Sequence, residues 1–269
     1  MAAMSENPVI TSIKPNPNVR IAIAYEDADV LVVEKPAGMV TQPGKGHTTD
    51  SLLNGVFALK NGSMGKLLHN QGVRRDFGLL HRLDRETSGL LVIAKMPSAY
   101  DQLRRDFEAR KVDKDYLAIT AGIPAPAQGV VQARLKEVQV PNPAGYGSIK
   151  KVVVTRQGQE AISAYQVMSQ VRGKTDAAPA ALVRVTIKTG RLHQIRAHMM
   201  FLNCQVLGDD LYAAPADAVN VKAYPHPPRL CLHATRLGFK HPTEGKWVHF
   251  KMPLPADLAA YAKKLGLAV

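Results

Sequence analysis

GLLHRLDRETSGLLVIAK, residues 78–95, is the stretch of sequence that decides how this chain folds. Two apolar runs, Leu79-Leu80 and Leu90 to Ala94, enclose a charged segment that ends at Gly89. The second run has the composition of a buried strand. The charged segment is therefore expected to be a loop held between two buried elements.

Further elements are expected on both sides of this stretch. Upstream, the β-branched run over residues 30–34 predicts a buried strand that stops at Pro36-Ala37-Gly38. Thr49 or Asp50 can cap a helix over residues 52–59, and the Gly- and Arg-rich residues 60–76 suggest a loop. Downstream, Pro97 suits the first turn of a helix.

The rest of the chain mixes strands and helices without a regular alternation. Strands are predicted over residues 116–119 and 182–188, helices over 192–202 and from Pro255 to about Gly266, and a hairpin around HPTEGK at 241–246. Residues 120–150 and 213–229 are Pro-rich and are expected to be loops, with 141–151 the most mobile. The fold class expected is α+β, with a largely antiparallel central sheet and flanking helices.

The bulk composition favours a polyanionic partner. The chain has 269 residues, with 35 Lys+Arg against 22 Asp+Glu and a formal net charge of +13. A basic surface attracts nucleic acid, although an anionic membrane surface or a merely basic enzyme is an alternative. The two cysteines, Cys204 and Cys231, are expected to be buried thiols, and no stretch is apolar enough for a membrane span. These features predict a cytoplasmic protein.

Asp84 is the candidate catalytic group. It lies between Arg82 and Arg85, which favour an ionised carboxylate that can act as a nucleophile or a base. The alternative is that Asp84 only caps a turn by accepting hydrogen bonds from the amides of Thr87 or Ser88.

TGRLHQIRAH, residues 189–198, is the second candidate site. It spans a strand-to-helix junction, where free amides together with Arg191 and Arg196 suit phosphate, unless the arginines only form a solvated helix face. His193 and His198 are five residues apart, about 140° around a helix, so they are not expected to share a metal ion. Tyr116 can stack on an unpaired base or can be an ordinary core tyrosine.

These segments together resemble a known family. HRLDRETSGLLVIAK resembles the signature of the RluA-type pseudouridine synthases. The resemblance continues in order through VLVVEKPAGMVTQPG, KDYLAITAG, TGRLHQIRAHM with VLGDDLY, and LCLHATRLGFKHP with FKMPLP, and it covers about Ala24 to Asp257.

The resemblance implies roles for individual residues. Asp84 would be the catalytic aspartate, Tyr116 would pack on the target uracil and take part in proton transfer, and Arg196 would orient Asp84, with Arg191 a neighbouring candidate. Arg82 would fill the space of the flipped base. The other residues expected to bind the substrate are His81, Arg85 and Leu232.

The resemblance also implies the activity and its setting. The expected reaction is a cofactor-free isomerisation of uridine in structured RNA, in a stem-loop of rRNA or tRNA, by a monomer. Residues 1–19 would be a tail, and residues 20–269 would form one catalytic domain of two fused subdomains around a central cleft. No S4-type domain is expected before it. A non-catalytic RNA-binding module and a metal-dependent nuclease are the rival interpretations.

Overall fold

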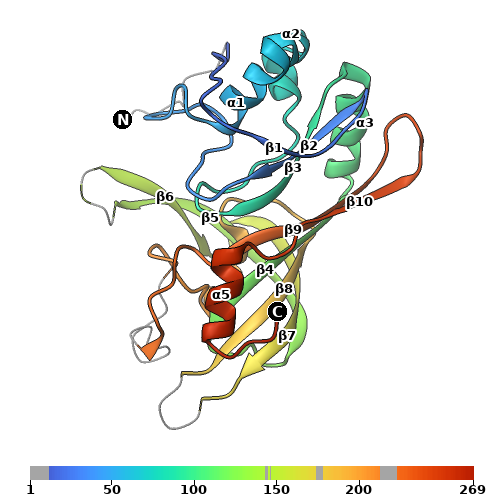
Figure 1. Cartoon of the computed structure of the whole chain (residues 1–269). Coiled ribbons are helices and arrows are strands. Elements are labelled where there is room, and N and C mark those ends of the chain that lie inside the picture. The colour runs from blue at the N-terminus through green and yellow to red at the C-terminus, as the bar shows by residue number, and fades with distance from the viewer. Residues whose placement is uncertain (1–11, 143–144, 146, 174–177, 213–222) are drawn as a thin grey trace. The chain divides into compact units, whose positions relative to one another are not determined.

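The computed structural model describes residues 12–142, 145, 147–173, 178–212 and 223–269 of the chain (Figure 1). The chain divides into two compact units. Unit 1 extends to Val112 and includes Gly238–Phe250, and unit 2 comprises Asp113–Leu237 and Lys251–Val269. The strand β9, Leu232–Lys240, therefore passes from unit 2 into unit 1.

Residues 1–11 of the predicted tail lie outside the described residues, whereas residues 12–19 are part of unit 1 and are held in it by specific contacts. Ile13 is buried, and the side-chain amide of Asn54 donates to the carbonyl of Lys14 at 2.7 Å. The backbone amide of Asn16 donates to the Asn54 carbonyl at 2.9 Å. Proline and asparagine disfavour regular structure here, but the irregular chain is still fixed by these contacts.

Unit 1 is built on three antiparallel strands in the order β1-β2-β3. Their bounds are Ala22–Glu26, Val30–Lys35 and Ser88–Ala94. Every side chain of β3 is buried, as are nearly all those of β2. The strands predicted from the runs at 30–34 (VLVVE) and 90–94 (LLVIA) are therefore confirmed, because a strand buried on both faces lacks polar alternation.

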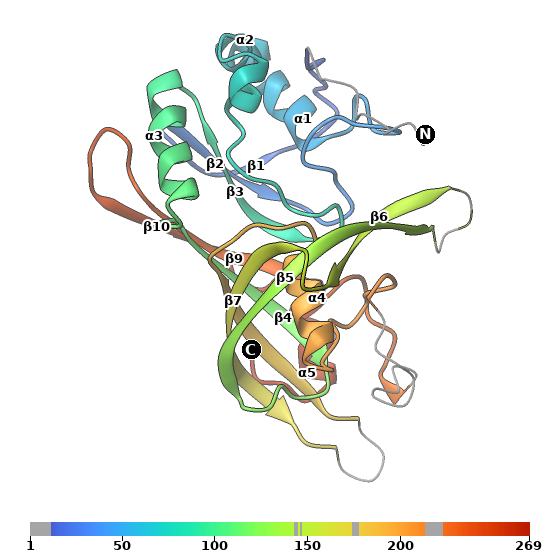
Figure 2. The same ribbon diagram turned by 180° about the vertical axis from the view of Figure 1, so that it is seen from behind.

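Three α-helices accompany this sheet. The helices α1 and α2 lie together, and α3 lies apart from them beside β3 (Figures 1 and 2); their bounds are Leu52–Ala58, Ser63–His69 and Pro97–Glu108. The helix predicted to begin at Pro97 is confirmed. The cap of α1 is Ser51, in a reciprocal capping box with Asn54, and not Thr49 or Asp50.

The loop predicted over residues 60–76 is wrong. This segment holds α2 between two short 3-10 helices, η1 Leu59–Gly62 and η2 Val73–Gly78. Met64, Leu68 and Phe77 are buried. A Cβ at Gly65 would lie 2.5 Å from the carbonyl oxygen of Phe57, so this glycine allows close packing where the sequence suggested a loop.

Unit 2 contains a larger antiparallel sheet with the strand order β4-β8-β7-β5-β6. In β8, Val183, Val185 and Ile187 are buried and Arg184 is exposed, which confirms the predicted half-buried strand. The mixed α+β class with largely antiparallel pairing is confirmed as well. The bounds are Asp113–Ala121 for β4, Ala180–Ile187 for β8, Gln159–Val171 for β7, Gln128–Pro141 for β5 and Ser148–Val154 for β6.

The prediction of loops over residues 120–150 is wrong for most of that range. β5 and β6 pair there, from Leu135 opposite Val154 to Pro141 opposite Ser148. Only two of the fourteen side chains of β5 are buried, so its apolar alternation is too sparse to reveal a strand. Residues 143, 144, 146 and 213–222 of the two predicted loops lie outside the described residues.

The remaining elements follow the predicted order. The helix α4, Gln194–Phe201, contacts β5, β6 and β7 (Figure 2), and α5, Ala256–Lys264, is the last helix in the sequence. β9 pairs with β10, Trp247–Lys251, in the predicted hairpin. Cys204 and Cys231 are buried free thiols, as predicted. None of the helices in the described ranges is long and apolar enough to cross a membrane.

Candidate active site

The HRLD loop, residues 81–87, carries the candidate catalytic group of unit 1 immediately before β3. The backbone amide of Thr87 donates to the backbone carbonyl of Asp84 at 3.1 Å and closes a turn. The Asp84 side chain is partly buried, whereas Arg82 and Arg85 on either side are exposed. The loop therefore carries a partly buried carboxylate flanked in the chain by two exposed arginines, of which Arg85 donates to the Gly38 carbonyl at 3.1 Å.

Lys35, at the end of β2, fixes the backbone of this loop. Its side chain is fully buried, and its Nζ donates to the carbonyls of Pro36, Met39 and Arg85 at 2.8, 2.7 and 3.0 Å. The amide of Gly38 donates to the same Arg85 carbonyl at 2.8 Å. A buried ammonium with three carbonyl partners is well satisfied, so it ties the turn after β2 to the residue after Asp84.

Thr41 provides a second clamp on the opposite side of Asp84. Its buried hydroxyl donates to the carbonyl of Leu83 at 2.9 Å and accepts from the Leu83 amide at 3.3 Å. The residues before and after Asp84 are thus both anchored. The sequence singled out neither Lys35 nor Thr41, because a lysine ending a strand and a threonine in a loop have no distinctive pattern.

His81 connects the HRLD loop to the rest of unit 1. The amide of Val92 donates to its Nε2 at 3.2 Å, which places the proton of a neutral ring on Nδ1. The ring also stacks on Phe107 of α3, with centroids 5.2 Å apart. This geometry gives His81 a structural role, and its contact with RNA stays a prediction.

Tyr116 lies in unit 2, buried on β4 opposite Val185 of β8. Lys114, two residues earlier, shares its face of the strand. A Cβ at Gly190 would lie 3.8 Å from the Lys114 Nζ, so the ammonium reaches the loop before α4. Burial, and secondarily the charge of Lys188, lowers the pKa of Lys114 to about 8. The sequence did not single out Lys114, although its spacing from Tyr116 was a usable signal.

Gln194, the first residue of α4, organises the loop that carries Arg191. Its Oε1 accepts from the Thr189 hydroxyl at 2.7 Å and from the Arg191 amide at 3.1 Å. Its Nε2 donates to the Ile162 carbonyl at 3.0 Å and to the Ser163 hydroxyl at 2.9 Å. Arg191 is exposed, and its Nε donates to a carbonyl of β7 at 3.1 Å. This buried amide therefore fixes the strand-to-helix junction.

Arg196 is almost completely buried in α4. It forms a bidentate ion pair with Asp209, with N–O distances of 2.7 and 2.8 Å, and lies 5.0 Å from the ring centroid of Tyr212. One Asp209 oxygen also accepts from the amides of Leu211 and Tyr212. The sequence did not single out Asp209. Asp84 belongs to the other unit, and its orientation by Arg196 stays a prediction.

The two histidines of this region have separate protein partners. The His193 Nδ1 lies 3.0 Å from the Tyr212 hydroxyl, and the His198 Nδ1 lies 2.9 Å from the Ser163 hydroxyl. Burial lowers the pKa of His198 to about 4, so this ring is neutral near pH 7. Leu232 is buried at the start of β9, and its expected contact with the substrate stays a prediction.

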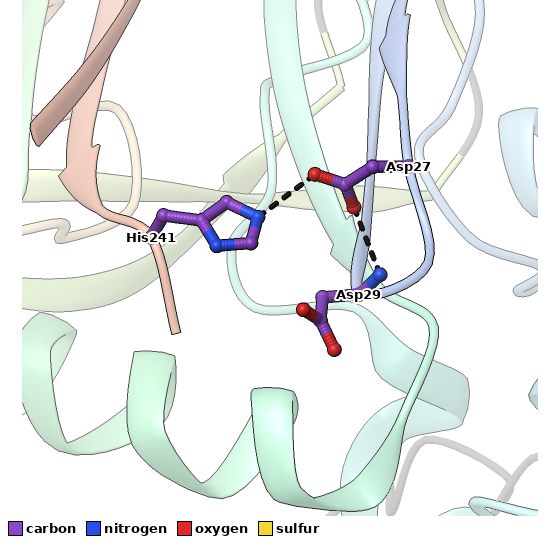
Figure 3. Close-up of side chains that lie close together, drawn as sticks. All are labelled: Asp27, Asp29 and His241. Carbon is purple, nitrogen blue, oxygen red and sulfur yellow. Dashed lines mark hydrogen bonds and ion pairs between the residues drawn. The ribbon is translucent and has the colours of Figure 1, made fainter. Parts of the chain in front are cut away.

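Asp27, Asp29 and His241 form the one group of side chains in the described residues that could hold a metal ion. Figure 3 shows the Asp27 carboxylate between the His241 ring and the Asp29 amide. One carboxylate oxygen accepts from the His241 Nε2 and the Tyr25 hydroxyl, each at 2.8 Å, and the other accepts from two backbone amides. The His241 Nδ1 accepts from an amide of its own hairpin at 3.2 Å. Because protein donors already occupy these atoms, the pair is a structural pin, called here the Asp27–His241 pin.

Comparisons with known proteins identify the same family as the sequence motifs. A family model described as RNA pseudouridylate synthase matches residues 29–200. An uncharacterized RNA pseudouridine synthase of Bacillus subtilis is 35% identical over 247 residues, covering 90% of this chain and 72% of the relative. A ribosomal large subunit pseudouridine synthase D of Zymomonas mobilis is 34% identical over 255 residues, covering 93% of this chain and 74% of the relative.

A solved structure of similar fold is named for the same family. The human protein named RNA pseudouridylate synthase domain containing 4 is similar with a TM-score of 0.66 and 28% sequence identity, covering 92% of this chain and 94% of that one. The span matched by the family model includes the HRLD loop, Tyr116 and Arg196. This chain therefore belongs to the RNA pseudouridylate synthase family, whose members are isomerases.

Proposed function

We propose that this chain isomerises a specific uridine of structured RNA to pseudouridine, with Asp84 as the catalytic carboxylate. The observation that carries the proposal is the setting of Asp84. Its backbone is clamped through Lys35 and Thr41, and exposed arginines lie two residues before it and one residue after it in the chain. A carboxylate needed only to cap a turn would not require this arrangement of accessible positive charge.

The proposed reaction rearranges one nucleotide and leaves its composition unchanged. The bond between uracil N1 and ribose C1′ breaks, the base turns, and a bond forms between C5 and C1′. C5 loses its proton and N1 gains one, so the reaction requires no oxidant, reductant or cofactor. An ionised Asp84 can act by attack on C1′ or by removing a sugar proton to give a glycal.

The target base must leave its stack before either route can begin. Flipping costs a few kcal/mol and favours uridines in loops and bulges. Exposed Arg82, two residues before Asp84, is the proposed group that occupies the vacated space. In unit 2, Tyr116 is the proposed surface for the flipped uracil, Arg196 the proposed partner that orients Asp84, and Lys114 a proposed phosphate contact.

Large-subunit ribosomal RNA is the proposed substrate. Relatives from Zymomonas mobilis, Pseudomonas aeruginosa and Neisseria meningitidis, 32–34% identical to this chain, are named ribosomal large subunit pseudouridine synthase D. These names support ribosomal RNA over a tRNA stem-loop. The net charge of +13 supplies sequence-independent attraction to either RNA.

The role of Asp84 is tested by pseudouridine formation in vitro on RNA from cells that lack the protein. We expect Asp84→Asn to lower turnover by about 10²- to 10⁴-fold or more while RNA binding stays intact. The matched control is Glu86→Gln, an exposed acid of the same loop, which should keep most of the activity. Substantial turnover by Asp84→Asn would refute the role.

A further inference from the structure

The hairpin of residues 238–250 in unit 1 has one anchored face and one exposed face. On β10, Trp247 and His249 are exposed, whereas Val248 and Phe250 are partly buried. The Phe250 ring contacts the rings of Tyr25 and Phe239, with centroids 5.1 and 5.8 Å apart. Together with the Asp27–His241 pin at the hairpin turn, these contacts hold the strand in place, so the outer face is presented on a fixed backbone.

The exposed face carries a flat aromatic surface. Trp247 is 52% exposed and is the only tryptophan of the chain. Its ring is stacked on the His249 ring, with centroids 5.8 Å apart and an interplanar angle of 11°. Single exposed apolar side chains are common and need no explanation. Two nearly parallel rings on one strand face are different, because they form a platform of the kind on which nucleobases stack.

A small cavity opens beside this platform. Its volume is about 260 Å³, and it is lined by Gln102, Asp106 and Lys111 from the α3 region and by Lys240 and Trp247 from the hairpin. Both views place α3 and β10 on the same side of unit 1 (Figures 1 and 2). Pockets for drug-sized ligands are about 300–1,000 Å³, so this volume suits a single planar group.

The groups around the cavity have three chemical characters, aromatic, hydrogen-bond accepting and cationic, which together suit the base and the phosphate of one nucleotide. The Trp247 ring offers a stacking face. Asp106, which is buried, accepts a hydrogen bond from the Gln102 amide at 3.2 Å, so this end can accept further hydrogen bonds from the N–H edge of a base. Lys111 and Lys240 are exposed and supply two ammonium groups for phosphate. A nucleotide joins a base to a phosphate, so it can use the aromatic face and the lysines at the same time.

We propose that the cavity beside Trp247 binds an unpaired nucleotide of the RNA substrate, with the base stacked on Trp247 and its phosphate near Lys111 and Lys240. This contact is separate from the catalytic loop and would help to select RNA with a single-stranded nucleotide at a set distance from the target uridine. The inference rests on the proposed function, because it requires that the chain bind RNA.

The single tryptophan gives this proposal a direct signal. The Asp84→Asn protein, which should bind RNA without turnover, is titrated with a short single-stranded RNA of mixed sequence and with a duplex of the same length. We expect the single-stranded RNA to quench the tryptophan emission strongly and the duplex to quench it weakly. Heparin, which offers negative charge without bases, should leave the emission nearly unchanged.

Affinities of labelled RNA are then compared at one salt concentration. Trp247→Ala should weaken binding of the single-stranded RNA by about 5- to 150-fold, and Trp247→Phe should keep most of the affinity because a ring remains. The control is Phe201→Ala, which removes an aromatic side chain of similar exposure, 55%, from α4 and should bind normally. Melting temperatures of all variants establish that each is folded.

The outcomes separate this inference from the proposed function. Tryptophan emission that stays constant while labelled RNA binds, with equal affinity of Trp247→Ala and the wild type, would overturn the nucleotide site and leave a protein contact as the use of this face. Failure of the proposed function would appear elsewhere, as absence of pseudouridine in the wild-type reaction even though the emission is quenched.

Discussion

Lys35 shows how much of this site depends on single buried groups. Its ammonium contacts three backbone carbonyls, one of them 50 residues away in the HRLD loop. Thr41 makes a comparable contact over 42 residues. Neither side chain needs to touch the substrate, because both act on the backbone that carries Asp84.

We predict that Lys35→Met lowers both stability and turnover. The substitution leaves three carbonyls without their charged donor, and hydrogen bonds to charged groups contribute about 1.5–3 kcal/mol each. The free energy of unfolding, measured by urea denaturation, should fall by at least about 1.5 kcal/mol, and pseudouridine formation should slow because the loop is less fixed. Lys66→Met, at an exposed position of α2, should change stability by less than about 0.5 kcal/mol. Equal denaturation midpoints and rates for Lys35→Met and the wild type would contradict this account.

At the scale of elements, sequence patterns predicted the strands and helices that bury either all of their side chains or the side chains of one face. The runs at 30–34 and 90–94 are short, β-branched and bounded by Gly or Pro, and the sequence at 182–188 alternates, so each is typical of a strand. β5 was missed because it buries only Val131 and Leu135 and displays polar residues on both faces. The helix α2 was missed because Gly65, which allows close packing, cannot be distinguished in the sequence from a glycine that forms a turn.

The candidate site divides in the same way between what the sequence could and could not predict. Motif residues such as Asp84, Tyr116 and Arg196 could be named in advance, because a family resemblance identifies residues one by one. Partners such as Asp209, Thr41 and Lys35 could not, because their roles depend on which distant backbone or side chain they meet after folding. Buried polar contacts of this kind leave no periodic signal in the sequence.

We predict that the hairpin of residues 238–250 depends on the Asp27–His241 pin. His241→Leu removes a buried hydrogen bond to an ionised carboxylate, at a cost of about 1.5–3 kcal/mol. Amide hydrogen exchange across residues 239–249 should become faster, whereas exchange in β2 and β3 should change less. His249→Leu, at an exposed position of the same hairpin, is the control and should exchange like the wild type. Unchanged exchange in His241→Leu would mean that ring contacts alone hold the hairpin.

At the scale of the whole molecule, two charge effects act on different processes. The net charge of +13 favours association with RNA and makes it sensitive to salt. Buried histidines act instead on folding. His198 and His233 are fully buried, and burial lowers the pKa of each to about 4, from an ordinary value of 6.5.

We predict that the protein loses stability as the pH falls from about 6.5 toward 4. In this window the two histidines bind protons in the unfolded chain but stay neutral in the folded chain. Protonation therefore stabilises the unfolded state relative to the folded state. The shift from 6.5 to about 4 corresponds to on the order of 3 kcal/mol for each histidine at the acid end. Urea denaturation at a series of pH values measures this slope. His198→Gln should make the slope shallower. An identical slope in wild type and His198→Gln would rule out this histidine as a source.

The most direct test of the central claim is to map pseudouridine in the RNA of cells that lack this gene, complemented with the wild type or with Asp84→Asn. The account predicts that one or a few pseudouridines, in large-subunit ribosomal RNA, disappear in the deletion and return only with the wild type. Restoration of the same sites by Asp84→Asn, or a pseudouridine map that does not change when the gene is deleted, would contradict it.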